Sequence, residues 1–226
     1  MSNCRSKQIA LNFMDKSIAA IRKDYTIASL ALEDIKQDPI NQFKKWFDEA
    51  LDAKVNEPNA MNLATAAEGV VSSRIVLIKE IDVDGFVFYS NYTSDKAKAI
   101  GSNNHVALNF FWPELERQVR IQGLAQKISA ERSDAYFNSR PRASQIGAWV
   151  SPQSNVIEDR NFLDKRQQDF ETQFEGKDVP RPEHWGGYKI IPDLLEFWQG
   201  RSSRLHDRIK YNKTDSTTWQ IERLAP

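Results

Sequence analysis

The hydrophobic positions near the N-terminus repeat with a helical period. Along the segment 39–54 they recur every three or four residues, at Ile40, Phe43, Trp46, Phe47 and Leu51. Asp38 precedes this segment as a predicted N-cap, and Pro39 fits the first helical position, where the N–H that proline lacks is not needed. We therefore predict an amphipathic helix that buries one apolar stripe.

Further along, the pattern changes to short runs rich in Val, Ile, Phe and Leu, separated by turn residues, which is typical of β-strands. The predicted strands are 59–66, 73–81, 85–91, 105–112, 117–127, 185–191, 194–199, 204–211 and 218–224. The Asp84-Gly85 pair predicts a hairpin turn between the second and third strands. Helical segments interrupt this series at 94–103, with Ser94 as its N-cap, at 130–139 and at 155–175.

Strands dominate this order of elements, and the connections between them are mostly short. Because strand and helix do not alternate regularly and no G-x-G-x-x-G motif occurs, a doubly wound dinucleotide-binding fold has no support. The prediction is a mainly β fold, an antiparallel sheet or barrel with flanking helices. Residues 1–25 are predicted to form an N-terminal arm, and residues 26–226 a single domain.

Composition narrows the class of protein. The 226 residues carry 31 Lys and Arg against 31 Asp and Glu, and this net charge of zero disfavours a nucleic-acid-binding protein. Hydrophobic residues make up 40%, too many for a disordered chain, yet no run approaches the roughly 18 apolar residues of a membrane span. Cys4 is the only cysteine, which excludes a disulfide within the chain and fits a cytoplasmic protein.

Cationic residues gather in the segment 198–211. If 204–211 is a strand, side-chain alternation places four of them on one face, namely Arg204, His206, Arg208 and Lys210. A solvated edge strand often carries such charges. Here the cluster is mostly Arg and His and follows the aromatic residue Trp198, so we favour an anion site, because a planar guanidinium matches phosphate and carboxylate.

Two further elements have the residue types of a phosphate site. Tyr136 and Arg140 lie four residues apart on one helix face, and Ser144 follows where a new helix could begin. Arginines that merely match a helix dipole would give the same pattern. Arg74 and Lys79 bracket a hydrophobic strand, and marking the two ends of that strand is the commoner role of such a pair.

Ser94-Asp95-Lys96 opens a predicted helix and is a weaker phosphate candidate. No grouping of His, Asp and Glu has metal-ligand spacing, and no G-x-S-x-G or similar nucleophile motif occurs, so His105 and His184 are interpreted as structural. The residues alone therefore predict a β-rich protein that binds phosphate-bearing small molecules.

Seven segments together resemble one family. They are RIVLIK (74–79), FYSN (88–91), ERQVRIQG (116–123), YFNSRPRASQIGAWVSPQS (136–154), WGGYKI (185–190), EFWQGRSSRLHDR (196–208) and RLAP (223–226). In order and spacing they are similar to the pyridoxine/pyridoxamine 5′-phosphate oxidase family. Its members are homodimers with an FMN-binding split β-barrel, a Greek-key antiparallel barrel, and they hold FMN at the subunit interface.

The resemblance implies an FMN-dependent enzyme that oxidises pyridoxine 5′-phosphate and pyridoxamine 5′-phosphate to pyridoxal 5′-phosphate, with O2 as electron acceptor and H2O2 as product. In that reaction FMN accepts a hydride from the substrate C4′ carbon. The protein would orient the reactants and stabilise charge, because the cofactor carries the redox chemistry.

The resemblance also assigns roles by matching position. Expected FMN contacts are Arg74, Ile75, Val76, Leu77, Ile78, Lys79, Tyr89, Ser90, Lys96, Gln118, Gln153, Ser154, Trp198 and Arg208. Expected substrate contacts are Arg22, Tyr25, Lys79, Tyr136, Arg140, Ser144, Arg204 and His206. Of these, Arg204 and His206 are the predicted catalytic pair, and the segment 22–25 is expected to close over the substrate. No metal is expected.

Asp95 departs from the family pattern, which usually has a basic residue at this position in contact with FMN. Because an acid repels a phosphate, we expect Asp95→Arg to tighten FMN binding. Two other interpretations stay open. Another FMN split-barrel oxidoreductase with a different substrate is disfavoured by the SRPR and RLHDR segments, and a non-enzymatic pyridoxal-phosphate carrier is favoured only by Asp95.

Overall fold

The protein, seen here as a computed structural model that describes Ile18 and residues 23–226, consists mainly of strands. Their bounds are β1 (Ala60–Ala67), β2 (Val70–Ile81), β3 (Phe86–Asn91), β4 (His105–Trp112), β5 (Arg117–Lys127), β6 (Trp185–Gln199), β7 (Asp207–Lys213) and β8 (Trp219–Leu224). The helices are η2 (Leu32–Asp34), α1 (Pro39–Asp52), α2 (Asp95–Ser102), α3 (Ala130–Ser139), α4 (Arg142–Val150), α5 (Arg160–Gln173) and η3 (Ser202–Arg204).

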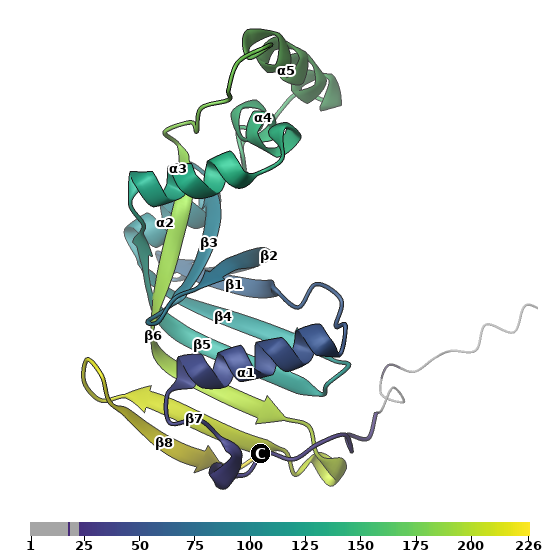
Figure 1. The fold of residues 1–226 in the computed structure, drawn as a ribbon, viewed down its shortest axis with the longest axis vertical. Helices are drawn as coiled ribbons and strands as arrows, with labels where there is room; N and C mark the ends of the chain where they lie inside the picture. Colours follow the sequence, from purple (N-terminus) through teal and green to yellow (C-terminus); the bar gives the residue numbers. More distant parts are fainter. Residues whose placement is uncertain (1–17, 19–22) are drawn as a thin grey trace, which may run out of the picture.

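The strands form one antiparallel sheet in the order β3-β2-β1-β4-β5-β6-β7-β8. β3 also pairs with β6, so the first six strands of this order close into a barrel, while β7 and β8 extend the sheet beyond it (Figure 1). Closure leaves the barrel strands without a free edge. This arrangement confirms the predicted antiparallel barrel with flanking helices.

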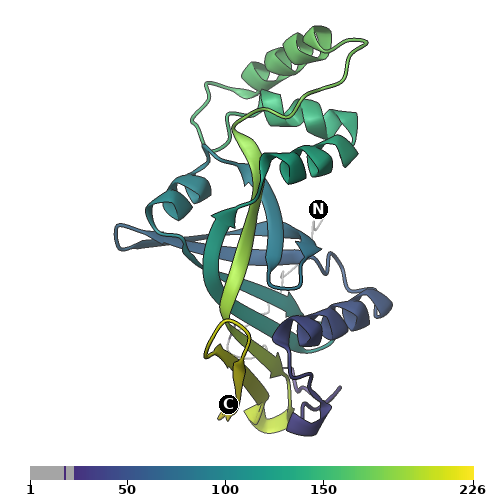
Figure 2. The same cartoon turned by 60° about the vertical axis from the view of Figure 1, so that its left-hand side comes forward.

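Strand β6 is continuous, where the sequence predicts two strands. Its first part, 185–190, pairs with β3, and its last part, 194–199, pairs with β7, while β5 pairs along both. The β5–β6 register shifts at Gly123, where an added Cβ would lie 2.2 Å from the Ile191 carbonyl oxygen. Glycine at this shift lets the strands stay paired through the bend. Figure 2 shows β6 running from the barrel to the helices α3–α5.

Helix α1 begins as predicted. The Asp38 side chain accepts a hydrogen bond from the Asn41 N–H at 2.7 Å, and Pro39 occupies the first turn. Phe43 is fully buried, and its ring meets Phe86 and Phe110 at centroid distances of 4.8 and 4.9 Å. The predicted stripe is wrong at its end, however, because Leu51 is 51% exposed. Its neighbour Ala50 turns inward instead and is fully buried.

The helices α3, α4 and α5 gather at the far end of β6 around a second hydrophobic cluster (Figure 1). Helix α3 has the predicted bounds. Helix α5 starts only at Arg160, five residues later than predicted at position 155, because Asp159 caps it by accepting from the Phe162 N–H at 3.0 Å. Helix α4, which the sequence indicated only through Ser144, begins directly after Pro141.

The predicted strand 204–211 is corrected by the structure. Ser203 and Arg204 have φ angles of 56° and 62°, so the chain turns there, and β7 begins only at Asp207. Because positive φ interrupts the extended backbone, Arg204 and His206 do not share a strand face with Arg208.

Ser94 is the N-cap residue of α2, as predicted, but its side chain accepts no hydrogen bond from the first turn of the helix. Its hydroxyl donates instead to the Asn91 carbonyl oxygen at 2.7 Å. Across the described ranges, the helices are all too short or too polar to cross a bilayer.

Candidate active site

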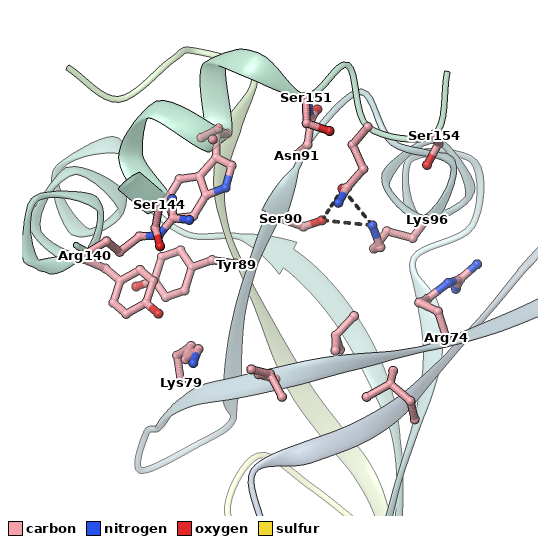
Figure 3. A pocket seen from close by; sticks show the side chains of 18 of the residues that line it. Arg74, Lys79, Tyr89, Ser90, Asn91, Lys96, Arg140, Ser144, Ser151 and Ser154 are labelled. Carbon is pink, nitrogen blue, oxygen red and sulfur yellow. Dashed lines mark hydrogen bonds between the residues drawn. The ribbon is translucent and has the colours of Figure 1, made fainter. Parts of the chain in front are cut away.

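A cavity of about 910 Å³ opens where β2 and β3 face the helices α2, α3 and α4 (Figure 3). The predicted site residues that line it are Arg74, Ile75, Val76, Leu77, Lys79, Tyr89, Ser90, Lys96, Tyr136, Arg140, Ser144, Gln153 and Ser154. Sequence reasoning missed Trp185, Asn91 and Ser151, which also line it. The WGGYKI segment carried Trp185, but nothing local indicated that its ring would face this cavity.

One cationic group of the cavity surrounds Lys96. The Lys96 Nζ donates to Ser90 Oγ at 3.2 Å and to Gln153 Oε1 at 3.0 Å, and Figure 3 shows Arg74 beside them. Burial lowers the pKa of Lys96, and the charge of Arg74 lowers it further. Among the described residues, neither cation has a carboxylate within ion-pair distance, so the group is suited to an anionic ligand.

Strand β1 holds Arg74 in place. Its Nη1 donates to the Leu63 carbonyl oxygen at 3.2 Å and to Thr65 Oγ1 at 2.9 Å. Burial lowers the pKa of Arg74, against the opposing charge of Asp95. Ile75 next to it is 64% exposed. The segment RIVLIK is therefore not a buried strand with charged ends, because its first residues line an open cavity.

A second cationic group contains Arg140, Tyr136, Ser144 and Lys79. Arg140 follows the last residue of α3, and its guanidinium lies 4.6 Å from the Trp185 ring centroid. Its Nη1 is buried and has no hydrogen-bond partner, and burial lowers its pKa. A desolvated, unpaired guanidinium nitrogen is costly unless a ligand completes it. Figure 3 shows the Ser144 hydroxyl, from the first turn of α4, close to Arg140.

Lys79 reaches the cavity through an irregularity in β2. Ile78 pairs with Phe88 and Glu80 with Val87, so two steps on β2 oppose one step on β3. Lys79 is the extra residue. A bulge of this kind changes the direction of a side chain, which explains how Lys79 lines the cavity while Ile78 is 3% exposed and packs in the barrel core. Ile78 itself does not line the cavity, and the expectation that it contacts FMN stays a prediction.

Three aromatic rings form a stack along the same wall. The ring centroids of Tyr89 and Tyr136 lie 3.9 Å apart, and those of Tyr89 and Trp185 lie 5.4 Å apart. The rings are within 16° of parallel in both pairs. The stack stabilises the position of Tyr136 beside Arg140, and it offers a flat apolar surface next to the cations.

The predicted catalytic pair lies in a different place. Arg204 and His206 line a separate hollow of about 590 Å³ together with Tyr25. The Tyr25 ring meets Trp198 edge-on at 5.7 Å, and Trp198 lies 4.6 Å from the His206 ring. His206 Nδ1 accepts a hydrogen bond from the Arg201 N–H at 3.1 Å. These residues share no lining with the 910 Å³ cavity.

The other predicted contacts also lie away from the cavity. Arg208 donates from Nε to the carboxylate of Glu196 at 2.8 Å and from Nη1 to the Ala225 carbonyl oxygen at 2.9 Å. Glu196 is only 4% exposed, and its hydrogen bond raises the pKa of Arg208. Gln118 lines a separate hollow of about 280 Å³ on β1, β4 and β5. Arg22 lies outside the described residues.

The predicted structural histidines behave differently from each other. His184 directly precedes β6, and its Nε2 lies 3.2 Å from the carbonyl oxygen of Ala148 in α4, so it connects these two elements. His105, in contrast, is exposed at the start of β4. Within residues 23–226, His, Cys, Asp and Glu form no group of three or more that could bind a metal ion.

Fold and site together define a split-barrel protein with one large cavity that carries two cationic groups. Residues 47–174 match the family described as "Pyridoxamine 5′-phosphate oxidase", and residues 185–226 match "Pyridoxine 5′-phosphate oxidase C-terminal dimerisation region". The chain belongs to the pyridoxamine 5′-phosphate oxidase family.

Individual relatives agree with this family. A curated protein from Nostoc punctiforme, named pyridoxine/pyridoxamine 5′-phosphate oxidase, is 52% identical over 214 residues, which cover 94% of this chain and 100% of the relative. The solved structure of PhzG from Burkholderia lata, in complex with tetrahydrophenazine-1-carboxylic acid, has a TM-score of 0.83 at 30% identity and covers 88% of this chain and 99% of PhzG.

A second solved structure shares the fold at lower identity. It is a pyridoxamine 5′-phosphate oxidase-related, FMN-binding protein from Nostoc punctiforme, with a TM-score of 0.66 at 17% identity over 88% of this chain and 100% of that one. Together the comparisons confirm the family and the split-barrel fold predicted from the seven segments.

Proposed function

We propose that the protein catalyses the FMN-dependent oxidation of pyridoxine 5′-phosphate and pyridoxamine 5′-phosphate to pyridoxal 5′-phosphate, with O2 as electron acceptor and H2O2 as product. The observation that carries this proposal is the pair of cationic groups in one cavity, around Lys96 and around Arg140, neither of which has an acidic partner among the described residues. Two phosphate esters, one on the cofactor and one on the substrate, account for both groups. The family membership supports the same activity.

The residues around Lys96 fit the phosphate of FMN. Arg74 and Lys96 supply positive charge, and Ser90, Gln153 and Ser154 supply polar side chains at the same end of the cavity. Both cations are partly desolvated, which strengthens their attraction for an anion. When bound there, FMN would supply the two-electron redox chemistry of the reaction.

The residues around Arg140 fit the substrate phosphate. The unpaired Nη1 of Arg140, the Ser144 hydroxyl, the Tyr136 hydroxyl and the Lys79 ammonium can all donate to phosphate oxygens. Ser144 also lies in the first turn of α4, where backbone N–H groups attract an anion. Such a fixed phosphate anchor would orient the rest of the substrate toward the reacting centre.

The catalytic side chains would come from a second copy of the chain. Trp198, Arg204, His206 and Arg208 all belong to the dimerisation region 185–226, and they lie away from the cavity of their own chain. In a two-fold dimer, this part of one copy completes the cavity of the other, with FMN at the interface. The segment that contains Tyr25 would close over the substrate at the same place.

In the mechanism, His206 and Arg204 act as hydrogen-bond donors. Because the Arg201 N–H occupies Nδ1 of His206, the neutral ring carries its proton on Nε2 and can donate from there to the substrate. Arg204 offers a guanidinium to the oxygen substituents of the substrate ring and so would hold C4′ in position for loss of the hydride. The rings of Tyr25 and Trp198 pack near His206, whereas Arg204 is exposed in the single chain, so the second copy would be needed to exclude water from this pair.

An anaerobic half-reaction tests the proposal. The purified protein is loaded with FMN, freed of oxygen and mixed with pyridoxine 5′-phosphate, and the flavin absorbance at about 450 nm is followed. We expect bleaching, recovery of the absorbance on admission of air, and one pyridoxal 5′-phosphate per flavin. Bleaching by another reductant but not by this substrate would indicate a different oxidoreductase of this fold. Binding of pyridoxal 5′-phosphate without bleaching would indicate a carrier.

A further inference from the structure

The carboxylate of Glu80 connects the β2–β3 hairpin with helix α3. Its Oε1 accepts a hydrogen bond from the Tyr89 hydroxyl at 2.5 Å. Its Oε2 pairs with the Arg132 guanidinium, whose Nε lies 3.1 Å away. Arg132 in turn donates to Asp82 Oδ2 at 2.8 Å, and Lys189 of β6 pairs with the same oxygen at 3.2 Å. Glu80 is thus the member of this ionic network that contacts a ring of the cavity.

The Tyr89 hydroxyl is fixed as a donor by these surroundings. Burial raises the pKa of Tyr89, and the hydrogen bond and charge of Glu80 raise it further, so the phenol stays protonated. A phenol that donates to a carboxylate in a salt bridge has one preferred orientation. The position of the Tyr89 ring therefore depends on Glu80 as well as on packing.

The orientation of Tyr89 is passed to the second cationic group by stacking. The Tyr89 ring stacks against both Tyr136 and Trp185, at centroid distances of 3.9 and 5.4 Å, and the Tyr136 and Trp185 rings lie 6.2 Å from each other, so each of the three rings is near the other two. Trp185 carries the Arg140 guanidinium on its face at 4.6 Å. A rotation of Tyr89 would therefore displace both the Tyr136 hydroxyl and the Arg140 guanidinium.

We propose that Glu80 is a positioning residue for the subsite that takes the phosphate monoester of the substrate. It fixes the Tyr89 hydroxyl, and the stacked rings then hold Tyr136 and Arg140 in the orientation that binds a phosphate. Glu80 itself does not line the cavity and would act through Tyr89. This inference rests on the proposed function, which it deepens by assigning to Glu80 the preference for a phosphorylated over an unphosphorylated substrate.

Comparison of a phosphorylated with an unphosphorylated substrate tests this role. For each variant we would measure kcat/KM with pyridoxine 5′-phosphate and with pyridoxine, and take their ratio. Glu80→Ala is expected to lower this ratio by about ten- to a hundredfold, mainly by raising KM for the phosphate ester, because a small misplacement of a charge clamp has effects of that size. Glu80→Gln keeps an acceptor for the Tyr89 hydroxyl and is expected to restore most of the ratio.

Asp82→Asn is the matched control. It removes a carboxylate from the same network, with its bonds to Arg132 and Lys189, but leaves the Glu80–Tyr89 bond in place. We expect it to keep the wild-type ratio. Tyr89→Phe removes the donor of the Glu80–Tyr89 hydrogen bond. The double variant Tyr89→Phe/Glu80→Ala is expected to have a kcat/KM ratio no lower than that of the single variant with the lower ratio, because both substitutions break the same interaction.

Two binding measurements separate the possible failures. The affinity for FMN is measured by flavin fluorescence, and the affinity for pyridoxal 5′-phosphate by equilibrium titration of each variant. Weaker pyridoxal 5′-phosphate binding in Glu80→Ala than in Asp82→Asn supports the inference even without turnover. An unchanged ratio in Glu80→Ala, an equal loss in Asp82→Asn, or a loss confined to FMN affinity would overturn it. Wild-type protein that oxidises neither substrate contradicts the proposed function instead.

Discussion

His206 accepts a hydrogen bond at Nδ1 from the backbone N–H of Arg201, with 3.1 Å between the two nitrogens. A ring nitrogen that accepts in this way carries no proton, so Nε2 is the donor of the neutral ring. The turn at Ser203 and Arg204, with its positive φ angles, brings the edge of the His206 ring back to this backbone N–H. Tertiary structure thus selects one tautomer of the predicted catalytic histidine.

Substitutions at His206 should separate the two ring nitrogens. His206→Asn places an acceptor near Nδ1 but no donor near Nε2, whereas His206→Gln places a donor near Nε2. We expect His206→Asn to lower kcat/KM for pyridoxine 5′-phosphate by about ten- to a hundredfold, the effect of one lost hydrogen bond, and His206→Gln to lose less. Steady-state kinetics of both variants check this. Equal activities in the two variants would contradict the prediction that His206 donates from Nε2.

Mixed dimers should recover activity if two chains build each site. We expect Arg140→Met and Arg204→Met each to be nearly inactive. After the two are mixed and allowed to exchange subunits, about a quarter of wild-type activity should return, since half of the dimers are mixed and each then has one intact site. Mixing Arg140→Met with Lys79→Met is the control, because both residues lie in the same cavity and no intact site can form. No recovery in the first mixture would mean that one chain holds the whole site.

Asp95 should weaken the binding of FMN. It lines the cavity at the end that carries Arg74 and Lys96, and its side chain is 70% exposed and pairs with Lys98 at 3.6 Å. Because an exposed charge interaction contributes about 0.2–1 kcal/mol, Asp95→Asn should tighten FMN binding by about 1.4- to fivefold, and Asp95→Arg by more. Titration of the apoprotein with FMN, followed by flavin fluorescence at low and high salt, measures this.

The matched control for Asp95 is Asp164→Asn on α5, an exposed acid paired with Arg160. We expect it to leave the affinity for FMN unchanged. The Asp95 prediction fails if Asp95→Asn binds FMN as the wild type does at low salt, where electrostatic effects are largest. In α2 itself, loss of an acid from the first turn should cost a few tenths of a kcal/mol to about 1 kcal/mol of helix stability.

Asp207 should stabilise the fold in a pH-dependent way. Burial alone would raise its pKa, but hydrogen bonds from the Leu30 N–H, Arg223 and Arg201 outweigh this and hold the pKa below the usual 3.8. A carboxyl whose pKa is lowered by folding contributes fully above its unfolded pKa, and the contribution is lost as the pH falls through the folded pKa. Asp207→Asn should therefore reduce the free energy of unfolding by about 1–3 kcal/mol near pH 7.

Urea unfolding of the Asp207→Asn variant at several pH values checks this. The difference from wild type should be constant from about pH 7 to pH 5 and shrink below about pH 4. Asp193→Asn, at an exposed position of β6, is the control and should differ little from wild type throughout. A difference that grows as the pH falls would contradict the direction of the pKa shift.

Much of the candidate site could be predicted from local patterns and from the seven segments. The segments around Arg74, Lys96 and Arg140 each carried a cation beside a hydroxyl, and the structure brings all three to one cavity. The prediction failed where backbone conformation changes within a few residues. Alternation alone put Arg204 and His206 on a strand face, because nothing in their residue types signals positive φ at Ser203 and Arg204.

The sequence by itself determined the order and type of most elements, the cap and first turn of α1, and the family, because these depend on local periodicity and on ordered motifs. Only the tertiary structure decided which cations share a cavity and which side chains orient them. Lys79 enters the cavity through a change of strand register, and Glu80 meets Arg132 across 52 positions of the chain. Such contacts depend on how strands pair and helices pack, and this information is not contained in any single segment.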